Sequence, residues 1–288
     1  MNTCKLPLNL RNLYGIYEIM AIDDKNIRVF FESHPVFTID ELREFYLFSD
    51  SSREASDMIR YNKKMERIGR IKDGLYYSVR PGQSTQHTSV DPYLVASKLA
   101  PDAVLAYHTA LDLFGFGHSI FNTYYYFSNR FHPALRFQNG HFRAVVTPDK
   151  LQKKSKVNFG TEKVERLGMK FLITGKERTL VESLERPQYC GGFEEMYRSL
   201  EKIPYLQPDV ILDYLQLREQ KNLYARVGFF LEQHRDDFHV EESFLQRLAR
   251  DIPVQPVYWV SDRKGGTLVK RWNLIVPDIV KHRKWEEF

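Results

Sequence analysis

The sequence predicts an α+β protein, and three observations lead to this class. Residues 23–80 contain short segments with apolar residues at helical spacing, followed by Asp73-Gly74, a strong β-hairpin signal. Residues 122–174 contain extended, aromatic segments such as "NTYYYFS" and "MKFLIT". Residues 177–250 return to helical spacing. Helices and strands that are separated along the chain in this way are typical of the α+β class.

The composition is that of a globular protein, since 43% of the 288 residues are apolar and 27% are charged. A chain of this length can form two domains with their own hydrophobic cores. No apolar run approaches the roughly 18–20 residues of a membrane span, and the N-terminus has no signal-like apolar stretch. Cys4 and Cys190 are expected to be unpaired thiols. These features predict a cytoplasmic protein with no membrane partner, no metal and no cofactor.

Positive charge is concentrated in one part of the chain. The formal net charge is +5, and residues 130–170 hold ten Lys or Arg against three Asp or Glu. A separate basic zone on a nearly neutral background suggests an anionic polymer as partner. The alternative is a solvated basic face without any partner.

The first helix is expected in "DDKNIRVFFESHP". Ile27, Phe30 and Phe31 share one face of it, and Pro35 ends it. The second helix lies in "TIDELREFYLF" and opens with a capping box, Thr38 followed three residues later by Glu41. Its apolar stripe consists of Leu42, Phe45 and Tyr46.

The third helix is expected in "REASDMIRYNKKMERIG". Ala55, Met58, Ile59 and then Met65 can face inward, and Gly69 would end the helix as a C′ glycine. The hairpin "RIKDGLYYSVRPG" comes directly after it.

Helix, helix, turn, helix and hairpin in this order are the pattern of a winged helix-turn-helix domain. The predicted organisation has four parts. They are an N-terminal arm (1–22), a winged helix-turn-helix DNA-binding domain (23–80), a linker rich in Ser, Thr, Gly and Pro (81–92), and a mixed α/β C-terminal domain (93–288).

The third helix and the hairpin carry the residues that are expected to bind DNA. Polar and basic side chains recur at spacings of three and four, opposite the apolar face. A helix that enters the major groove needs donors for base edges and cations for phosphates. The predicted DNA-binding residues are Ser52, Arg53, Ser56, Arg60, Lys63, Lys64, Arg67, Arg70, Lys72, Tyr76 and Tyr77. The alternative is a unit that packs or dimerises without binding DNA.

The expected C-terminal domain starts with two short helices separated at Pro101 and continues with strands that include a hairpin at Asn139-Gly140. Helical segments follow, and two strands flank a Lys-Gly-Gly turn near the end. The basic residues of the β-rich part predict a secondary basic surface. Its members are Arg136, Arg143, Lys150, Lys153, Lys154 and Lys156.

Two places could hold enzymatic groups. His108 and Asp112 are four residues apart on a helix, so their side chains could meet, but no third partner can be named. The apolar neighbours of His108 favour a packed, hydrogen-bonded histidine near the core.

The second place is the helix "ERTLVESLERP", where Glu177, Glu182 and Glu185 lie beside Arg178 and Arg186. Paired carboxylates can serve as acid and base, but the apolar stripe is that of a plain amphipathic helix whose charges form ion pairs. No phosphate-binding glycine loop, nuclease pattern or two-metal pattern is found. The sequence therefore predicts that the chain is not an enzyme. The alternative is a nucleic-acid-processing enzyme that is targeted by the winged helix and uses one of these two places.

Taken in their order, several segments resemble the AbiEi-type antitoxins of abortive-infection, type IV toxin–antitoxin systems of phage defence. They are "FTIDELREF", "RYNKKMERIGRIKDGLYYSVRPG", "YLVASKLAPDAVLAYHTALDLFGFG", "ERTLVESLERPQYCGGFEEMYRSLE" and "LYARVGFFLEQH". The resemblance covers roughly residues 25–240 and is poorest over the last 45 or so residues.

The resemblance implies a transcriptional autorepressor that binds double-stranded DNA at inverted repeats in its own promoter, with self-association on the DNA. It also implies that the C-terminal domain counteracts a nucleotidyltransferase toxin encoded alongside, without a requirement for direct contact. A plain regulator with no toxin partner would share the DNA-binding prediction.

Overall fold

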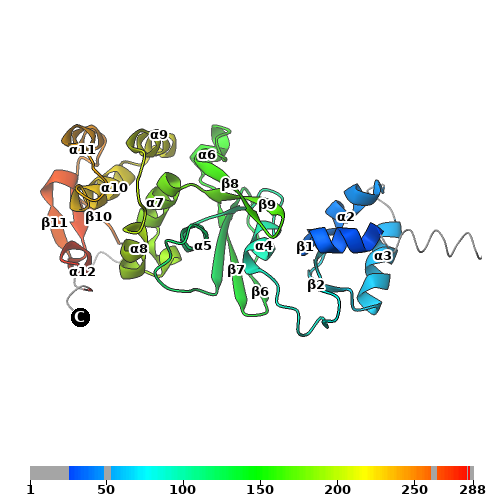
Figure 1. Ribbon diagram of the computed structural model, residues 1–288. Helices are drawn as coiled ribbons and strands as arrows, with labels where there is room; N and C mark the ends of the chain where they lie inside the picture. Colours follow the sequence, from blue (N-terminus) through cyan, green and yellow to red (C-terminus); the bar gives the residue numbers. More distant parts are fainter. Residues whose placement is uncertain (1–25, 49–52, 261–264, 284, 286–288) are drawn as a thin grey trace, which may run out of the picture. The chain divides into compact units, whose positions relative to one another are not determined.

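The computed structural model describes residues 26–48, 53–260, 265–283 and 285 (Figure 1). Helices and β-sheets are both present, which confirms the α+β class. The chain divides into two compact units. The first holds the described residues up to Lys98 together with Glu165–Lys170, and the second holds the rest.

The first unit starts with a helix over residues 26–33. The elements that follow are β1 (Val36–Thr38), α2 (Ile39–Tyr46), α3 (Arg53–Lys64), β2 (Ile68–Lys72) and β3 (Leu75–Ser78). β3 lies between β1 and β2 and is antiparallel to both. The core between the helices and this sheet consists of Ile27, Phe30, Phe31, Phe37, Leu42, Ile59 and Ile68.

Two local predictions for this unit are confirmed. Glu41 N donates to Thr38 Oγ1 at 3.2 Å and Thr38 N donates to Glu41 Oε2 at 2.8 Å, so the capping box is complete. The β2–β3 turn places Gly74 at φ 75°, a left-handed conformation that glycine adopts without a Cβ clash. The turn is also tied to α2, because Ile39 N donates to Gly74 O at 2.9 Å.

The predicted end of the third helix is wrong. The helix stops at Lys64, and Glu66 turns the chain with φ 53°. Gly69 lies inside β2, where a Cβ atom would come within 2.0 Å of the Tyr77 ring. A glycine after a helix can serve as a cap or make room for a neighbour, and here it makes room. Met65, expected to face inward, follows the end of the helix and is 49% exposed.

Residues 81–98, which the sequence analysis divides between a linker and the C-terminal domain, belong to the first unit. Within them, α4 (Pro92–Ser97) starts at Asp91, whose carboxylate accepts two backbone N–H groups of the first turn. An ion pair joins Lys98 to Glu41 and so connects this segment to α2.

The second unit contains a mixed sheet, and only the turn end of one of its hairpins (Glu165–Lys170) is grouped with the first unit. Its strands are β4 (Val104–Leu105), β5 (Thr123–Ser128), β6 (Leu135–Phe137), β7 (Gly140–Val146), β8 (Thr161–Arg166) and β9 (Met169–Thr174). Their order in space is β6-β7-β5-β4-β9-β8. β5 pairs with β7 in parallel, and β4 pairs with β9 in parallel, whereas β4–β5 and β6–β7 are antiparallel. The sequence did not indicate β4, because a strand of two residues has no periodicity.

Helices of this unit cover the sheet and one another. They are α5 (His108–Leu113), α6 (Asp149–Lys153), α7 (Lys176–Glu185), α8 (Phe193–Leu200), α9 (Pro208–Arg218), α10 (Lys221–Gln233), α11 (Glu242–Ala249) and α12 (Asp278–Lys281), with short 3₁₀ turns at Pro187–Cys190 and Lys270–Trp272. α7 packs against α5, α8, α9 and α10. It is the central helix of the unit, as can be followed in Figure 1.

A small sheet closes the described chain. β12 (Leu274–Val276) lies between β10 (Val257–Tyr258) and β11 (Thr267–Val269). The two predicted strands are therefore present, and β11 adds a third that the sequence did not indicate. Trp272 joins this part to the main core of the unit.

We predict that Gly69→Ala destabilises the first unit by about 1–3 kcal/mol, because the new methyl group collides with a buried ring in a well-packed sheet. Chemical denaturation monitored by circular dichroism measures the change. In a Tyr77→Leu background the same substitution should cost clearly less, since the ring is gone. An equal cost in both backgrounds would show that the close approach is not the cause.

Candidate nucleic-acid interface

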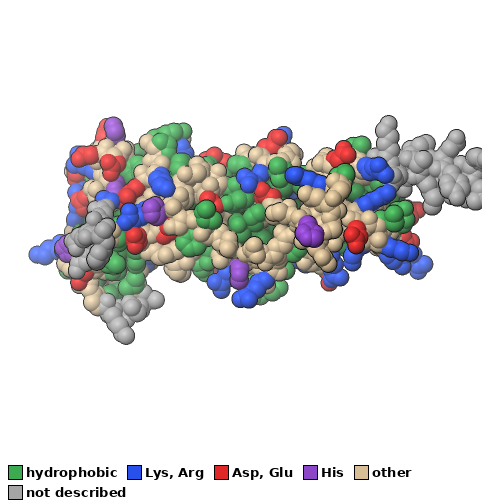
Figure 2. Space-filling view, turned by 60° about the horizontal axis from the view of Figure 1, so that its bottom comes forward, with side chains coloured by type: hydrophobic (Ala, Val, Ile, Leu, Met, Phe, Trp, Pro, Cys, Tyr) green, Lys and Arg blue, Asp and Glu red, His purple; other side chains and the backbone are tan. Residues whose placement is uncertain are grey.

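The outward face of α3 is basic. Ala55, Ile59 and Asn62 are buried on the opposite side, which turns the remaining faces to solvent. Five predicted DNA-binding residues are exposed there, namely Arg53, Ser56, Arg60, Lys63 and Lys64. Figure 2 shows Lys and Arg side chains gathered over the helices of the first unit. Ser52 lies outside the described residues.

Two arginines of this surface already form ion pairs with carboxylates. Arg60 pairs with Asp57 one turn earlier on α3, and Arg70 of β2 pairs with Asp73 at the tip of the hairpin. All four side chains are largely exposed. Exposed pairs of this kind contribute only about 0–1 kcal/mol, so a phosphate group can replace the carboxylate at little cost.

Tyr61 is a residue of this face that sequence reasoning missed. It is 55% exposed, and the Arg67 guanidinium lies 6.0 Å from its ring centroid. The signal was available, because position 61 follows exposed Asp57 by one helical turn. Its phenol group can donate to a phosphate, and its ring can pack against a sugar.

Several predicted contact residues are not available for DNA. Tyr77 is buried, its hydroxyl donates to Thr85 O at 3.0 Å, and burial raises its pKa. Tyr76 is half-buried and stacks on Phe37 with ring centroids 5.8 Å apart. Lys72 is half-buried near the tip of the hairpin. Neighbouring residues of β3 point to opposite faces of the sheet, and both faces are covered, because Tyr76 packs on the core and Tyr77 lies at Thr85.

Arg67 also departs from the prediction. The α3 helix ends three residues before it, so Arg67 does not extend the basic face of that helix. It is half-buried, its Nη1 lies 3.5 Å from Asn62 Oδ1, and its backbone N donates to Asn62 O at 3.0 Å. The prediction assumed that the helical spacing continued beyond Lys64.

The predicted secondary basic surface falls into two separate groups in the second unit. Arg136 is opposite His141 near the turn of the β6–β7 hairpin, whereas Figure 1 shows α6 at the other end of β7. Lys150 of α6 and Lys154, the residue directly after this helix, each lie 2.5 Å from the carboxylate of Glu219. These hydrogen bonds lower the pKa of Glu219 to about 2. Two of the four lysines in and directly after α6 therefore join it to the end of α9.

The remaining members of that set are solvent-exposed. They are Arg136, Arg143, Lys153 and Lys156. Basic residues in two places, with part of their charge paired, form a weaker candidate for nucleic-acid binding than α3.

His108 is a packed residue, as the sequence predicted. It is buried, and its Nε2 lies 3.2 Å from Glu195 Oε1 on α8. The same carboxylate oxygen accepts from the backbone N of His118 at 3.0 Å and of Ser119 at 2.9 Å. Burial alone would raise the pKa of Glu195, but its hydrogen bonds with Ser119, His108 and Ser199 hold it below the usual value. This cluster anchors the loop after α5 to α8.

The α7 helix is more deeply buried than the sequence predicted. Its residues from Glu177 to Leu184 are all buried, so it has no solvent face. Glu182 accepts from Arg218 Nη1 at 3.0 Å and from the hydroxyl of Tyr214. Arg218 Nη2 also donates to both oxygens of Glu185, at 2.7 and 2.8 Å. The expected ion pairs are thus present, and they lie inside the core.

Neither place considered for enzymatic chemistry is an open site. The carboxylates of α7 are paired with arginines away from solvent, and Glu177 Oε1 accepts from Gln207 N at 3.0 Å. Within the described ranges, no three His, Cys, Asp or Glu side chains are grouped as metal ligands require. Cys190 is a free, buried thiol whose pKa burial raises to about 12, and Cys4 lies outside the described residues. None of the helices in the described part has the length and apolar surface needed to cross a bilayer.

We predict that Arg218→Met destabilises the second unit by about 3–5 kcal/mol, because it leaves Glu182 buried with fewer partners. Urea denaturation at pH 7 measures this change. Arg247→Met is the matched control, since Arg247 pairs with Asp209 on the surface and its loss should cost no more than about 1 kcal/mol. Similar small costs for both variants would contradict a structural role for the buried network.

The lowered pKa of Glu195 predicts acid sensitivity. A carboxyl group stabilises the folded protein when its pKa there lies below its value of about 4.3 in the unfolded chain. This contribution is fully present at pH values above about 4.3. The contribution is lost as the pH falls toward the folded pKa. Denaturation at pH 7, 5 and 4 should therefore show that Glu195→Gln is less stable than the unaltered protein at pH 7, with a smaller difference at pH 4. Glu194→Gln, on the exposed side of α8, should have little effect at pH 7. If the stability difference between Glu195→Gln and the unaltered protein grew as the pH falls, the pKa of Glu195 would not be lowered in the folded protein.

Comparisons with known proteins show similarity at the level of the fold. A scan against models of protein families gave no match, and neither did a search of curated proteins. The structure is similar to the crystal structure of the RV2827C protein from Mycobacterium tuberculosis, with a TM-score of 0.59 and 15% sequence identity. The likeness covers 92% of this chain and 94% of that one, so the two share a fold over nearly their whole lengths.

Proposed function

We propose that the protein is a DNA-binding transcriptional autorepressor, and that α3 is its recognition helix. The observation that carries this proposal is the outward face of α3, where Arg53, Arg60 and Lys64 are exposed and recur at spacings of seven and four. Residues at these spacings lie along one side of a helix. A major groove is wide enough to admit such a helix, and its walls are lined with phosphates.

The element order of the first unit supports the proposal of a winged helix-turn-helix. A helix, a short strand and two further helices precede the β2–β3 hairpin, and the three strands form one antiparallel sheet. In this reading α2 crosses the DNA backbone, α3 enters the groove, and the hairpin is the wing. Arg70 is the cation of the wing, and the nearby Asp73 makes the tip itself unfavourable for phosphate.

The proposed contacts divide into two classes. Near the start of α3, Arg53 and Ser56 can donate to base edges, whereas Arg60, Lys63 and Lys64 neutralise phosphates along its flank. Two copies on an inverted repeat would place two α3 helices in successive major grooves, with half-sites separated by about one helical turn of DNA or a multiple of it.

We further propose that the protein is the antitoxin of a type IV pair. The segments that resemble AbiEi-type antitoxins occur in the same order along the chain, and this resemblance supports the role. The segments lie in both units. The second unit would then counteract a nucleotidyltransferase toxin encoded alongside, without the need for a stable complex. A growth assay in which that toxin is expressed with and without the protein tests this half of the proposal separately from DNA binding.

The enzymatic alternative receives no support from the residues considered for it. His108, Glu177 and Glu182 are buried, and Glu185 is half-buried and bound to Arg218, so their polar atoms face protein groups. A nucleic-acid strand could not reach them without opening the core.

We predict that Arg53→Gln/Arg60→Gln/Lys64→Gln lowers affinity for the promoter DNA of its own operon at least tenfold in a gel-shift titration. Each phosphate contact that is lost should also reduce the slope of log K against log salt by about 0.9. The control is Arg136→Gln/Lys153→Gln/Lys156→Gln, which removes the same charge from the second unit. Equal losses for both variants would mean that general charge attraction, and not α3, accounts for binding. Circular dichroism should confirm that both variants are folded.

A further inference from the structure

One face of the main sheet carries basic side chains across neighbouring strands. β6, β7 and β5 lie side by side in this order. Arg136 of β6 is paired with His141 of β7, and His141 is paired in turn with Thr123 of β5. Paired residues of adjacent strands point to the same side of a sheet, so these three side chains form a row across the strands. Arg136 and His141 are both exposed.

Arg143 lies in a second row, two residues further along β7. It is paired with Tyr125 of β5, whose hydroxyl accepts a hydrogen bond from its guanidinium group. Successive residues of a strand alternate between the two faces, so Arg143 points to the same side as His141, roughly 6.6 Å along the strand. The burial of β7 follows this alternation, because Phe142 is buried and its two neighbours are exposed. Arg136, His141 and Arg143 therefore form one patch, the basic sheet face.

No acidic residue accompanies the basic sheet face in the sequence. Residues 113–148, which include β5, β6 and β7, contain three Arg and three His but no Asp or Glu. Among the described residues, no carboxylate pairs with Arg136, His141 or Arg143. The lysines of α6 in the same unit differ, because part of their charge is paired. The two guanidinium groups of the basic sheet face thus keep their full charge for an external anion.

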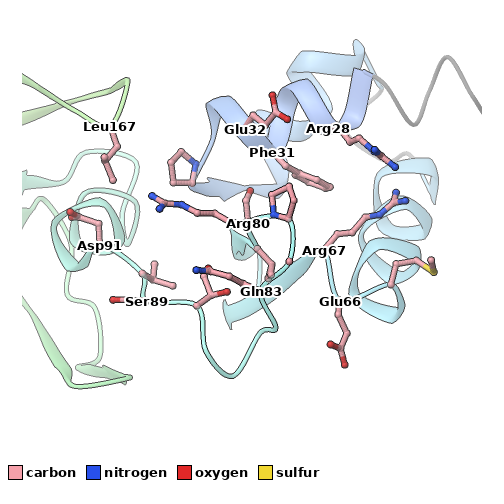
Figure 3. Close-up of a pocket in the computed structure, with 18 residues that line it drawn as sticks. Arg28, Phe31, Glu32, Glu66, Arg67, Arg80, Gln83, Ser89, Asp91 and Leu167 are labelled. Carbon is pink, nitrogen blue, oxygen red and sulfur yellow. The ribbon is translucent and has the colours of Figure 1, made fainter.

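The cavity of the first unit does not have this excess of one sign. Its lining, drawn in Figure 3, comes from the helix at residues 26–33, the turn after α3 and the chain after β3. The charged members of the lining are of both signs in equal numbers, namely Arg28, Arg67, Arg80, Glu32, Glu66 and Asp91. Their formal charges cancel, so the basic sheet face is the more favourable place for an anion.

An exposed aromatic ring belongs to the loop between β5 and β6. Phe131 is 78% exposed. Its neighbours hold the loop in place, because Asn129 N donates to Asp102 at 2.7 Å and His132 Nε2 lies 3.1 Å from Ser128 Oγ. The Asp102 carboxylate also accepts from Ser128 Oγ at 2.7 Å, so it is already bound within the protein. An exposed ring on a fixed loop offers a surface on which a nucleobase can stack.

We propose that the basic sheet face binds a single-stranded nucleic acid, with phosphates on Arg136 and Arg143 and a base stacked on Phe131. Guanidinium groups suit phosphates, because each can donate two parallel hydrogen bonds to phosphate oxygens. Cationic surfaces with aromatic rings bind single strands without reading their sequence. Sheet faces are used for single strands in this way, whereas a double helix is bound by an element that projects into a groove. The proposal goes beyond the repressor function and does not depend on it.

Fluorescence anisotropy of a labelled oligo(U) RNA, titrated with the full chain, tests the proposal. An RNA of about 12 nucleotides falls within the roughly 4–16 that single-strand sites occupy. We expect saturable binding that Arg136→Gln/Arg143→Gln weakens at least tenfold, since two charge-assisted contacts are lost. The slope of log K against log salt should fall by about 0.7 for each lost phosphate contact.

Lys153→Gln/Lys156→Gln is the matched control for charge. It removes the same charge from exposed lysines in and after α6 and should leave RNA affinity unchanged. Circular dichroism should confirm that both charge variants are folded.

Phe131→Ala tests the stacking contact separately. It should weaken RNA binding severalfold with an unchanged salt slope, because stacking releases no counterions. Ile120→Ala is its control, since Ile120 is 92% exposed in another loop of the same unit and should not affect RNA binding. Unaltered affinity in Phe131→Ala would overturn the stacking part of the proposal.

Three results would overturn the proposal as a whole. They are no RNA binding by the unaltered protein, equal losses in the two charge variants, and loss of RNA binding in Arg53→Gln/Arg60→Gln/Lys64→Gln. The last result would assign the RNA to α3, whereas we expect this variant to keep its full RNA affinity. Promoter binding that is unchanged in the same variant would contradict only the proposed role of α3, so failures of the two proposals can be distinguished.

Discussion

The second unit depends on keeping the charges of α7 paired inside the core. Burying an unpaired carboxylate or guanidinium costs several kcal/mol, and α7 has no solvent face to which its charges could turn. Arg218 of α9 must therefore stay on Glu182 and Glu185. Arg226 of α10 extends the same network, since it donates to the carbonyl groups of Glu185 and Trp259 at 2.8 and 2.9 Å. One buried helix thereby fixes two neighbouring helices and the small terminal sheet.

The first unit uses charge in the opposite way. Its cations are spread over an exposed helix face and a hairpin, and the ion pairs of Arg60 and Arg70 lie in water, where they contribute little. Such pairs hold side chains loosely and can be exchanged for phosphates. The buried arginines of α7 and α9 serve architecture, whereas the exposed arginines of α3 are suited to binding. This contrast is the physical basis for placing the proposed DNA contact in the first unit.

A shared fold at 15% identity with a mycobacterial protein means that few side chains are needed in common to specify this arrangement. Such a fold requires apolar residues at the buried positions and an ion-pair or hydrogen-bond partner for each buried charge. Surface charges and cavity linings can then differ between proteins of one fold. For that reason the proposed DNA contact is argued from this chain's own exposed residues, and each proposal has its own experiment.

The sequence by itself determined the local features. Apolar spacing located the helices, the Thr38–Glu41 pair marked the start of α2, Asp73-Gly74 marked the hairpin, and the helical repeat of basic residues identified the face of α3. These features depend on residues a few positions apart, which is the range over which a sequence pattern can be read. Only the tertiary structure decided which residues meet across long separations. His108 meets Glu195 and Glu182 meets Arg218, while Tyr77 turns inward onto Gly69 and Arg143 lies beside Tyr125. A pattern shows which face of an element is buried or charged, but the partner of that face is set by packing between elements.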